Sequence, residues 1–245
     1  MRLLVSVRDA HEAHAALAGG ADIIDAKEPA LGPLAPVEPK ALRAICAAVP
    51  PAVALSVALG DAIPSALAAT VAAVEPLGER CLLFFKAAVV SPGADAAATG
   101  IAAACRLLER RRDRAALIVA RYVDEPADAV DLSQWIAVSA RAGARGVLLD
   151  TSRKHGPGLF GFVGPRELAA LRREATRRGI WLALAGGITL ANLAQVAAVR
   201  PHVLGVRGAV CEGTRTDALS AARVLQLREA LARFSRSQGP RALPV

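Results

Sequence analysis

Short apolar runs alternate with longer amphipathic segments along the whole chain. The runs have the length of buried strands, and the longer segments carry apolar residues at helical spacing. The pattern predicts strands at residues 3–7, 23–26, 53–57, 82–85, 116–120, 146–149, 181–185 and 203–206. It predicts helices at residues 9–17, 39–48, 94–112, 133–141, 165–179, 190–199 and 217–234, and a short helix that begins at Pro64. Strands and helices therefore alternate strictly.

This alternation determines the expected fold class. Alternating strands and helices imply a parallel sheet with helical crossovers. Eight such units within 245 residues favour a single-domain α/β TIM barrel. An open doubly wound sheet stays possible, because periodicity does not show that a sheet closes. No linker-like segment interrupts the pattern, so we expect a catalytic domain over residues 1–234 and a flexible tail over residues 235–245.

Composition narrows the classes of partner. Hydrophobic residues make up 54% of the chain and aromatic residues only 3%, so alanine, valine and leucine must build the core. The net charge of +8 either attracts anionic substrates or reflects a solvated arginine-rich surface. The arginine clusters lie on predicted helix faces with almost no aromatic residues between them, which argues against a nucleic-acid partner. We therefore expect a small phosphorylated substrate instead.

Cysteine and histidine spacing gives no sign of a metal site. The four cysteines are scattered without a CxxC pair, which fits a reducing cytoplasm. His11 and His14 flank Glu12 in an HExH arrangement, which lacks the HExxH spacing of zinc enzymes. We find no apolar run long enough for a membrane span and no signal peptide. Alanine-rich outer helices could bury against a second copy, which favours a homo-oligomer, or their apolar faces could be used on the barrel itself.

The scarcity of lysine directs attention to the few that remain. Only four of the 30 basic residues are lysine: Lys27, Lys40, Lys86 and Lys154. Lys27 and Lys86 each follow a predicted strand directly, and Lys154 lies in the glycine-rich loop after the sixth strand. Genome composition would explain the ratio but not these positions. Arginine cannot form an imine or act as a base near neutral pH, whereas a desolvated lysine can do both.

The strand ends bring these lysines together with carboxylates. TIM-barrel active sites lie at the C-terminal ends of the strands, and alternate strands supply one layer of side chains. Lys27, Lys86 and Asp150 are therefore expected in one layer, with Asp25 one layer below. A nearby cation and desolvation both favour a neutral amine, so one lysine could form an imine while the second moves protons. Asp25 and Asp150 could pair with the lysines or relay protons. The alternative is that Asp25–Lys27 and Asp150–Lys86 are structural ion pairs, but buried pairs of that kind are costly.

Two glycine-containing loops predict a phosphate site. Gly186 and Gly187 follow the seventh strand, and Arg207, Gly208 and Ala209 follow the eighth. The loops after these strands often bind phosphate through backbone N–H groups in TIM barrels. Arg207 would add positive charge, or could form a salt bridge instead. The long loop at residues 150–164, which contains Lys154, could act as a lid or could be an ordinary surface loop.

These residues together resemble a known family. The segments are GGADIIDAKEP (19–29), LLDT (148–151) with Lys154, LAGGI (184–188) and GVRGAVC (205–211), with further similarity at residues 56–61 and 159–160. They resemble the (5-formylfuran-3-yl)methyl phosphate synthases from residue 1 to about residue 233. The resemblance implies a TIM-barrel lyase of methanofuran biosynthesis, which serves one-carbon metabolism in methylotrophic bacteria. Such an enzyme condenses two molecules of glyceraldehyde 3-phosphate and releases phosphate and water.

The resemblance also implies residue roles. Lys27 would form the Schiff base and Lys86 would transfer protons, while Asp25, Asp150 and Lys154 fall at matching active-site positions. The imine is itself an electron sink, so we expect no metal and no organic cofactor. The chain departs from the family pattern at residues 120–124 and in the residues after Lys86.

Other functions stay open at this point. Another class I aldolase acting on a phosphorylated sugar would share the lysines and the phosphate loops. A ribulose-phosphate-binding barrel isomerase needs no lysine pair. A phospholigand sensor or a basic nucleic-acid-binding module would bind without turnover, and the converging lysines and carboxylates argue against both.

Overall fold

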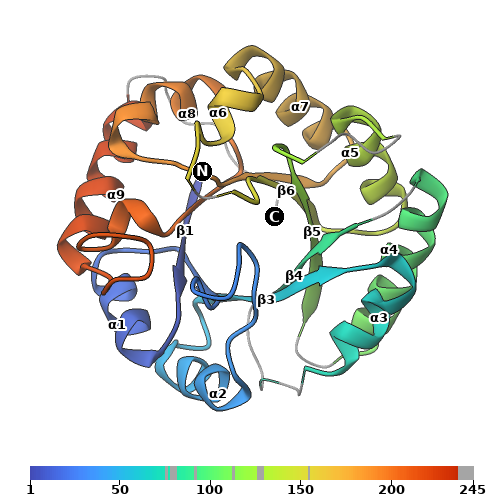
Figure 1. The fold of residues 1–245 in the computed structure, drawn as a ribbon, viewed down its shortest axis with the longest axis horizontal. Coiled ribbons are helices and arrows are strands. Elements are labelled where there is room, and N and C mark those ends of the chain that lie inside the picture. Colours follow the sequence, from blue (N-terminus) through green and yellow to red (C-terminus); the bar gives the residue numbers. More distant parts are fainter. Residues whose placement is uncertain are drawn as a thin grey trace.

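The protein is a closed parallel barrel surrounded by helices (Figure 1). The computed structural model describes residues 1–74, 77, 82–90, 93–111, 114–125, 130–153 and 155–236. Within them the strands are β1 (Arg2–Val7), β2 (Ile23–Ala26), β3 (Ala54–Ala62), β4 (Leu83–Val89), β5 (Ala115–Tyr122), β6 (Gly146–Asp150), β7 (Trp181–Leu184) and β8 (Val203–Val206). The strands pair in chain order, and β8 pairs with β1, which closes the barrel. The open-sheet alternative is therefore excluded.

Helices cover the outside of the barrel in a ring (Figure 1). They are α1 (Ala10–Ala18), α2 (Pro39–Ala48), α3 (Pro64–Ala72), α4 (Ala94–Glu109), α5 (Leu132–Arg141), α6 (Leu159–Phe162), α7 (Pro165–Arg177), α8 (Leu193–Val199) and α9 (Ala221–Arg236). Two short 3-10 helices, η1 (Leu190–Asn192) and η2 (Gly208–Val210), follow β7 and β8. Proline at the first turn of α2, α3 and α7 fits the start of each, because its missing N–H would have no partner there. Among the residues that the structure describes, no helix is long and apolar enough to cross a membrane.

Most strand ends agree with the apolar runs to within one residue, and β3, β4 and β5 extend further at their C-terminal ends. The expectation that Lys86 closes the fourth strand is wrong, since β4 continues to Val89. β3 likewise continues to Ala62, and the two strands pair to Ala62–Val89 after a register shift between Ala58 and Asp61. The extension is invisible in the pattern because small residues follow Lys86. Lys86 therefore lies inside the barrel wall, below the strand ends.

The C-terminal boundary also differs from the prediction. Helix α9 begins at Ala221, because residues 211–219 form a loop closed by an isolated bridge between Cys211 and Leu219. It runs to Arg236, so the first two residues of the predicted tail belong to this helix. The rest of the predicted tail, residues 237–245, lies outside the described residues.

Two apolar clusters hold the barrel together. The larger one fills the space between the strands and the helices, with outward-facing side chains such as Val5, Leu149 and Leu204. The smaller one lies inside the barrel and includes Ile23, Phe84 and Leu148. Side chains along each strand point alternately outward and inward, because successive residues of a strand face opposite sides of the sheet. Every second residue therefore points toward the barrel axis, where the candidate site is found.

Candidate active site

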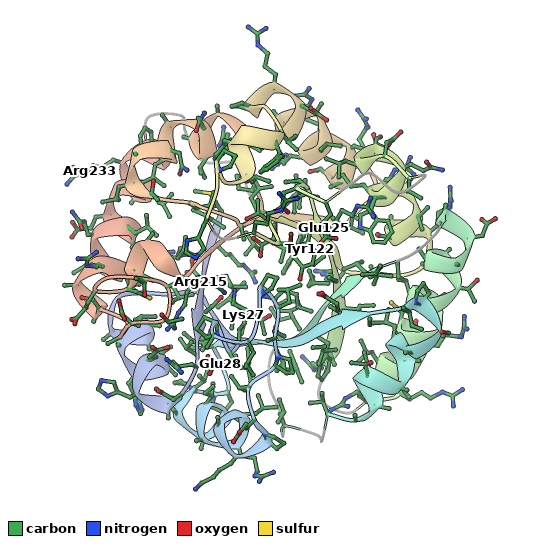
Figure 2. The ribbon with its side chains drawn as sticks, viewed as in Figure 1. Lys27, Glu28, Tyr122, Glu125, Arg215 and Arg233 are labelled. Carbon is green, nitrogen blue, oxygen red and sulfur yellow. The ribbon has the colours of Figure 1, made fainter. Side chains whose placement is uncertain are left out.

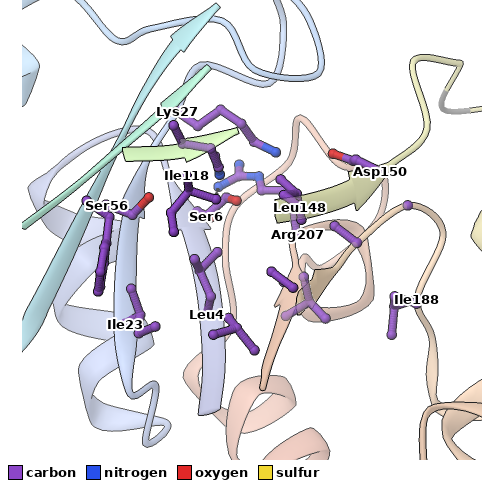
Figure 3. A pocket seen from close by; sticks show the side chains of 18 of the residues that line it. Leu4, Ser6, Ile23, Lys27, Ser56, Ile118, Leu148, Asp150, Ile188 and Arg207 are labelled. Atoms are coloured by element: carbon purple, nitrogen blue, oxygen red, sulfur yellow. Dashed lines mark hydrogen bonds between the residues drawn. The ribbon is translucent and has the colours of Figure 1, made fainter. Parts of the chain in front are cut away.

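A cavity of about 190 Å³ runs from the C-terminal strand ends into the barrel (Figure 3). Its lower part is apolar, and the lining residues there include Leu4, Ile23, Phe84, Ile118, Leu148 and Trp181. Its upper part is polar, and the lining residues there include Ser6, Lys27, Ser56, Lys86, Asp150 and Arg207. Figure 3 shows Lys27, Asp150 and Arg207 at one end of the cavity and Leu4 and Ile23 at the other. The cavity exists because several inward positions are small, including Gly146, Ala183 and Gly205.

Trp181 and its neighbours close the N-terminal end of the barrel. The Trp181 ring packs against Phe84 with ring centroids 5.3 Å apart. The guanidinium carbons of Arg2 and Arg145 lie 5.1 and 5.0 Å from the centroid of the Trp181 ring. Cations over an aromatic face are attracted to it. The cavity therefore has a packed floor, and its entrance lies at the strand ends.

A buried ion pair joins β2 and β4 in the barrel. The Lys86 Nζ donates to Asp25 Oδ2 at 2.7 Å, and both side chains are almost wholly buried. The Ser6 hydroxyl on β1 donates to the same oxygen at 2.7 Å. Ser56 on β3 lies beside Asp25 in the strand register. The expected convergence of Asp25 and Lys86 is thus present, and Asp25 rather than Asp150 is the partner of Lys86.

The charge on Asp25 is set by two opposing effects. Burial alone would raise the pKa of the Asp25 carboxyl, because water no longer stabilises its anion. The positive charges of Lys86 and Lys27 and the hydrogen bond from Lys86 outweigh burial and hold the pKa below its usual range. Asp25 is therefore a carboxylate at neutral pH, positioned to orient two lysines.

Lys27 and Asp150 lie at the polar end of the cavity. Lys27 continues the strand ladder through its backbone N–H, which donates to Val7 O at 2.9 Å, and the residue is only 7% exposed. Asp150 ends β6, is 2% exposed, and accepts the Thr151 N–H at 2.7 Å. The structure thus places Lys27, Lys86 and Asp150 around one cavity, as the strand-end argument predicted. Lys154 lies outside the described residues.

Asp124 anchors the start of the long loop after β6. Its carboxylate accepts the backbone N–H groups of Ser152 at 2.6 Å and Arg153 at 2.8 Å. The Ser152 hydroxyl donates to the same carboxylate at 3.2 Å. Burial opposes ionisation of Asp124, but these hydrogen bonds prevail and lower the pKa of the carboxyl below its usual value. Asp124 belongs to the segment at residues 120–124 that departs from the family pattern. It therefore fixes the start of the loop that could act as a lid.

The other residues of the strand-five end have separate partners. The Tyr122 hydroxyl donates to Asp61 Oδ1 on β3 at 2.8 Å. Burial, that hydrogen bond and the nearby carboxylates raise the pKa of the Tyr122 hydroxyl above its usual range, so it stays protonated. The Arg121 guanidinium lies 5.5 Å from the centroid of the Trp135 ring, on the outer side of the barrel wall. Of these, only Tyr122 faces the barrel axis.

The Gly186–Gly187 turn brings the β7 loop against the β6 loop. Both residues have positive φ, 93° and 67°, which favours glycine. A Cβ at Gly186 would lie 2.9 Å from the Thr151 N and 3.1 Å from Asp150 Oδ1. Gly186 O accepts the Leu159 N–H at 2.9 Å, which ties the start of α6 to this turn. Gly186, Gly187, Gly208 and Ala209 all line the cavity, as a phosphate cradle there requires.

Arg207 lines the cavity, but its N–H groups already have protein acceptors. The guanidinium forms an ion pair with Glu12 and donates to the backbone oxygens of Ser6, Arg215 and Asp217. These interactions account for all five N–H groups of the side chain. The salt-bridge alternative is therefore the one observed, and a phosphate contact by Arg207 stays a prediction. Glu12, from the HExH segment, is the acid of that salt bridge.

Several residues of the site were not found from the sequence. Ser6 and Ser56 are polar residues inside apolar strands and share the inward phase of their neighbours, a signal that could have found them. Arg215 lines the cavity from the loop after β8, and nothing in the linear pattern distinguishes it from the other arginines. Within the described residues, no group of three or more His, Cys, Asp or Glu side chains could hold a metal ion.

Comparison with known proteins gives a consistent family. The family model described as 4-HFC-P synthase matches residues 3–228. A Methylorubrum extorquens protein, named provisionally as a (5-formylfuran-3-yl)methyl phosphate synthase, is 36% identical over 98% of this chain and 94% of its own. The (5-formylfuran-3-yl)methyl phosphate synthase of Methanothermobacter thermautotrophicus is 30% identical over 96% of this chain and all of its own length.

Solved structures agree on the fold. A 3-hexulose-6-phosphate synthase aligns with a TM-score of 0.59 and 20% identity, over 94% of this chain and 100% of that one. A phosphoribosyl anthranilate isomerase from Thermus thermophilus aligns with a TM-score of 0.56 and 23% identity, over 98% and 100%. At these identities the likeness concerns the barrel alone.

Proposed function

Because the chain belongs to the 4-HFC-P synthase family, we propose that it converts two molecules of glyceraldehyde 3-phosphate into (5-formylfuran-3-yl)methyl phosphate. One phosphate and two molecules of water leave in this reaction, which makes the enzyme a lyase of methanofuran biosynthesis. The observation that carries the proposal is the buried Asp25–Lys86 pair beside Lys27 at the polar end of the barrel cavity.

Lys27 is proposed to carry the substrate as an imine. Its side chain lines a cavity with an apolar floor, and a largely buried amine is a suitable nucleophile for a carbonyl carbon. The amine attacks the carbonyl of one triose, and water leaves. The Asp150 carboxylate, which lines the same cavity, then removes the proton from the neighbouring carbon, and the electron pair of that C–H bond moves into the protonated imine. The resulting enamine carbon forms the new C–C bond to the aldehyde of the second triose.

Lys86, Asp25 and Asp150 are proposed to move the protons. Lys86 Nζ carries the proton that it shares with Asp25, and Lys86 lines the same cavity as Lys27. It can pass a proton to an alkoxide or to a departing hydroxyl and recover it in a later step. Asp150 at the end of β6 can accept protons during ring closure and dehydration. The aromaticity of the furan makes the final steps favourable.

Two phosphate groups require two anchoring regions. We propose that the phosphate retained in the product lies against the Gly186–Gly187 turn and the loop at Gly208 and Ala209. The phosphate that leaves would lie beneath the loop after β6, which Asp124 anchors and which carries Lys154. Departure of an anion there would be helped by a cationic side chain, because that charge stabilises the leaving group.

A second function shares the same lysines. Another class I aldolase would form the imine at Lys27 and the C–C bond but would release a phosphorylated aldol without elimination. The fold of 3-hexulose-6-phosphate synthase does not decide between the two, because barrels of this kind host many reactions. The products distinguish them.

The test is incubation of the purified protein with glyceraldehyde 3-phosphate. We expect ultraviolet absorbance of a furan aldehyde and inorganic phosphate to appear in equal amounts. Both signals should disappear in Lys27→Arg, which keeps the charge but cannot form an imine. Lys40→Arg, on helix α2 outside the cavity, is the matched control and should retain activity. A non-absorbing aldol without phosphate release would support the aldolase instead.

A further inference from the structure

We propose that Arg215 is the side chain that binds the phosphate group held at the loops after β7 and β8. The inference deepens the proposed function and rests on it. It transfers to Arg215 the role that the sequence pattern suggested for Arg207. Arg215 lies in the loop between η2 and α9, and none of the expected site residues occupies that loop.

The position of Arg215 places it over the phosphate cradle. Its side chain lines the same cavity as Gly186, Gly187, Gly208 and Ala209. A Cβ built on Gly208 would meet the Arg215 Cβ at 3.7 Å, so the arginine packs directly over that turn. Figure 2 labels Arg215 and Lys27 on the inner side of the helix ring, whereas Arg233 lies on its outer edge. A phosphate bound at Gly208 would therefore be within reach of the Arg215 guanidinium.

The guanidinium of Arg215 can donate further hydrogen bonds to a ligand. Its single hydrogen bond in the described structure runs from Nη2 to Gly32 O at 3.2 Å. Two other cations of the cavity differ in this respect: Lys86 is paired with Asp25, and Arg207 uses its five N–H groups on protein acceptors. Guanidinium binds phosphate through two parallel N–H bonds, a geometry that Arg215 can supply.

A buried scaffold holds Arg215 in place. The Arg207 Nε donates to the backbone oxygen of Arg215 at 2.7 Å, and Glu12 fixes Arg207 through its ion pair. The bond from Arg215 to Gly32 reaches the loop after β2, next to Lys27. Arg207 is thus a positioning residue, and its charge is neutralised by Glu12 rather than by substrate. Arg215 is the side chain that this arrangement presents to the cavity.

The charge balance around Arg215 favours an anion. Burial and the neighbouring Arg207 cation lower the pKa of the Arg215 guanidinium, while the carboxylate of Asp150 acts in the opposite direction. A half-buried guanidinium is stabilised when a dianion binds between it and the backbone N–H groups of the turn. The ligand class that fits is a phosphate monoester, and inorganic phosphate is its simplest probe.

The test compares Arg215→Met and Arg215→Lys with Arg223→Met, a control on the exposed face of α9. Three quantities are measured: the KM for glyceraldehyde 3-phosphate, the Kd for inorganic phosphate, and borohydride trapping of unphosphorylated glyceraldehyde on Lys27. We expect Arg215→Met to raise the KM and the Kd by about 30- to 100-fold and Arg215→Lys by about tenfold. Trapping of glyceraldehyde should stay unchanged in every variant, because that ligand has no phosphate.

The outcomes separate this inference from the proposed function. An unchanged phosphate Kd in both Arg215 variants would overturn the inference, and so would an equal loss of glyceraldehyde trapping, which marks a structural role. A wild-type protein that forms no furan would overturn the proposed function alone, because phosphate binding still reports on Arg215. If Arg215→Met does not fold, Arg215→Lys gives the same comparison with the positive charge retained.

Discussion

At the scale of single residues, Asp25 holds the site together. It accepts hydrogen bonds from Ser6 and Lys86 through one oxygen, and it is fully buried. A carboxylate in this position fixes the direction of the Lys86 amine and compensates the charge of Lys27. We therefore propose that its role is both structural and catalytic, and the two contributions can be measured separately.

Replacement of Asp25 by asparagine should impair both stability and activity. Removing one partner of a buried pair leaves Lys86 with an uncompensated charge, which costs about 3 to 5 kcal/mol in known cases. We expect a lower Tm and a loss of furan formation of at least about 100-fold, because Lys86 loses its proton partner. The measurements are thermal unfolding and the absorbance assay. A variant with the wild-type rate would contradict the role given to the pair.

The residue scale also shows what the sequence could and could not predict. Lysine scarcity and position directly after an apolar run were enough to place Lys27 and Lys86 in the cavity, because few other lysines compete with them. The Glu12–Arg207 ion pair joins residues 195 positions apart, and nothing local to either indicates it. Arg215 has the same difficulty: its exposure to the cavity depends on the path of a loop. Residues fixed by tertiary contacts alone stay hidden in a linear pattern.

At the scale of elements, the loops after β6 and β7 form one unit. The Gly186–Gly187 turn touches Asp150 and Thr151, and Gly186 O accepts the N–H of Leu159. Asp124 anchors the other side of the same loop.

The apolar runs predicted the strands well because burial on both faces leaves a clear signal. The contacts between these loops could not be predicted, since they depend on backbone atoms that approach closely.

A pair of glycine variants separates backbone strain from close approach. Gly186→Ala and Gly179→Ala both place alanine at positive φ, 93° and 73°. An added Cβ meets Thr151 and Asp150 at Gly186 but nothing within 4 Å at Gly179. We expect both to cost about 1 kcal/mol in the free energy of unfolding from the backbone, and only Gly186→Ala to lose about tenfold or more in kcat/KM. Equal activity in the two variants would refute a catalytic role for the contact.

At the scale of the whole molecule, the barrel should lose stability in mild acid through His202. Its Nδ1 accepts the Leu182 N–H at 2.9 Å, and the ring lies between β7, β8 and α7. Burial and the nearby Arg172 lower the pKa of His202 from 6.5 to about 4. The unfolded chain therefore binds a proton over this range that the folded chain does not, so stability falls as pH falls from about 6.5 to about 4.

Thermal unfolding tests this linkage. We expect the Tm to be lower at about pH 5 than at about pH 7, and the difference to shrink in His202→Asn, whose side-chain oxygen can replace Nδ1 as acceptor. His11, His14 and His155 are exposed and serve as controls, since their substitution should leave the pH dependence unchanged. A pH dependence that persists in His202→Asn would assign the effect to other groups.

Light scattering on the same samples tests the expected homo-oligomer.

Borohydride trapping tests most directly whether Lys27 carries the substrate as an imine. The protein is incubated with glyceraldehyde 3-phosphate, reduced, digested and analysed by mass spectrometry. We predict a triose phosphate adduct on the peptide that contains Lys27, and its absence in Lys27→Arg. An adduct on Lys86 instead, or furan formation by Lys27→Arg at a rate near that of the wild type, would contradict the account.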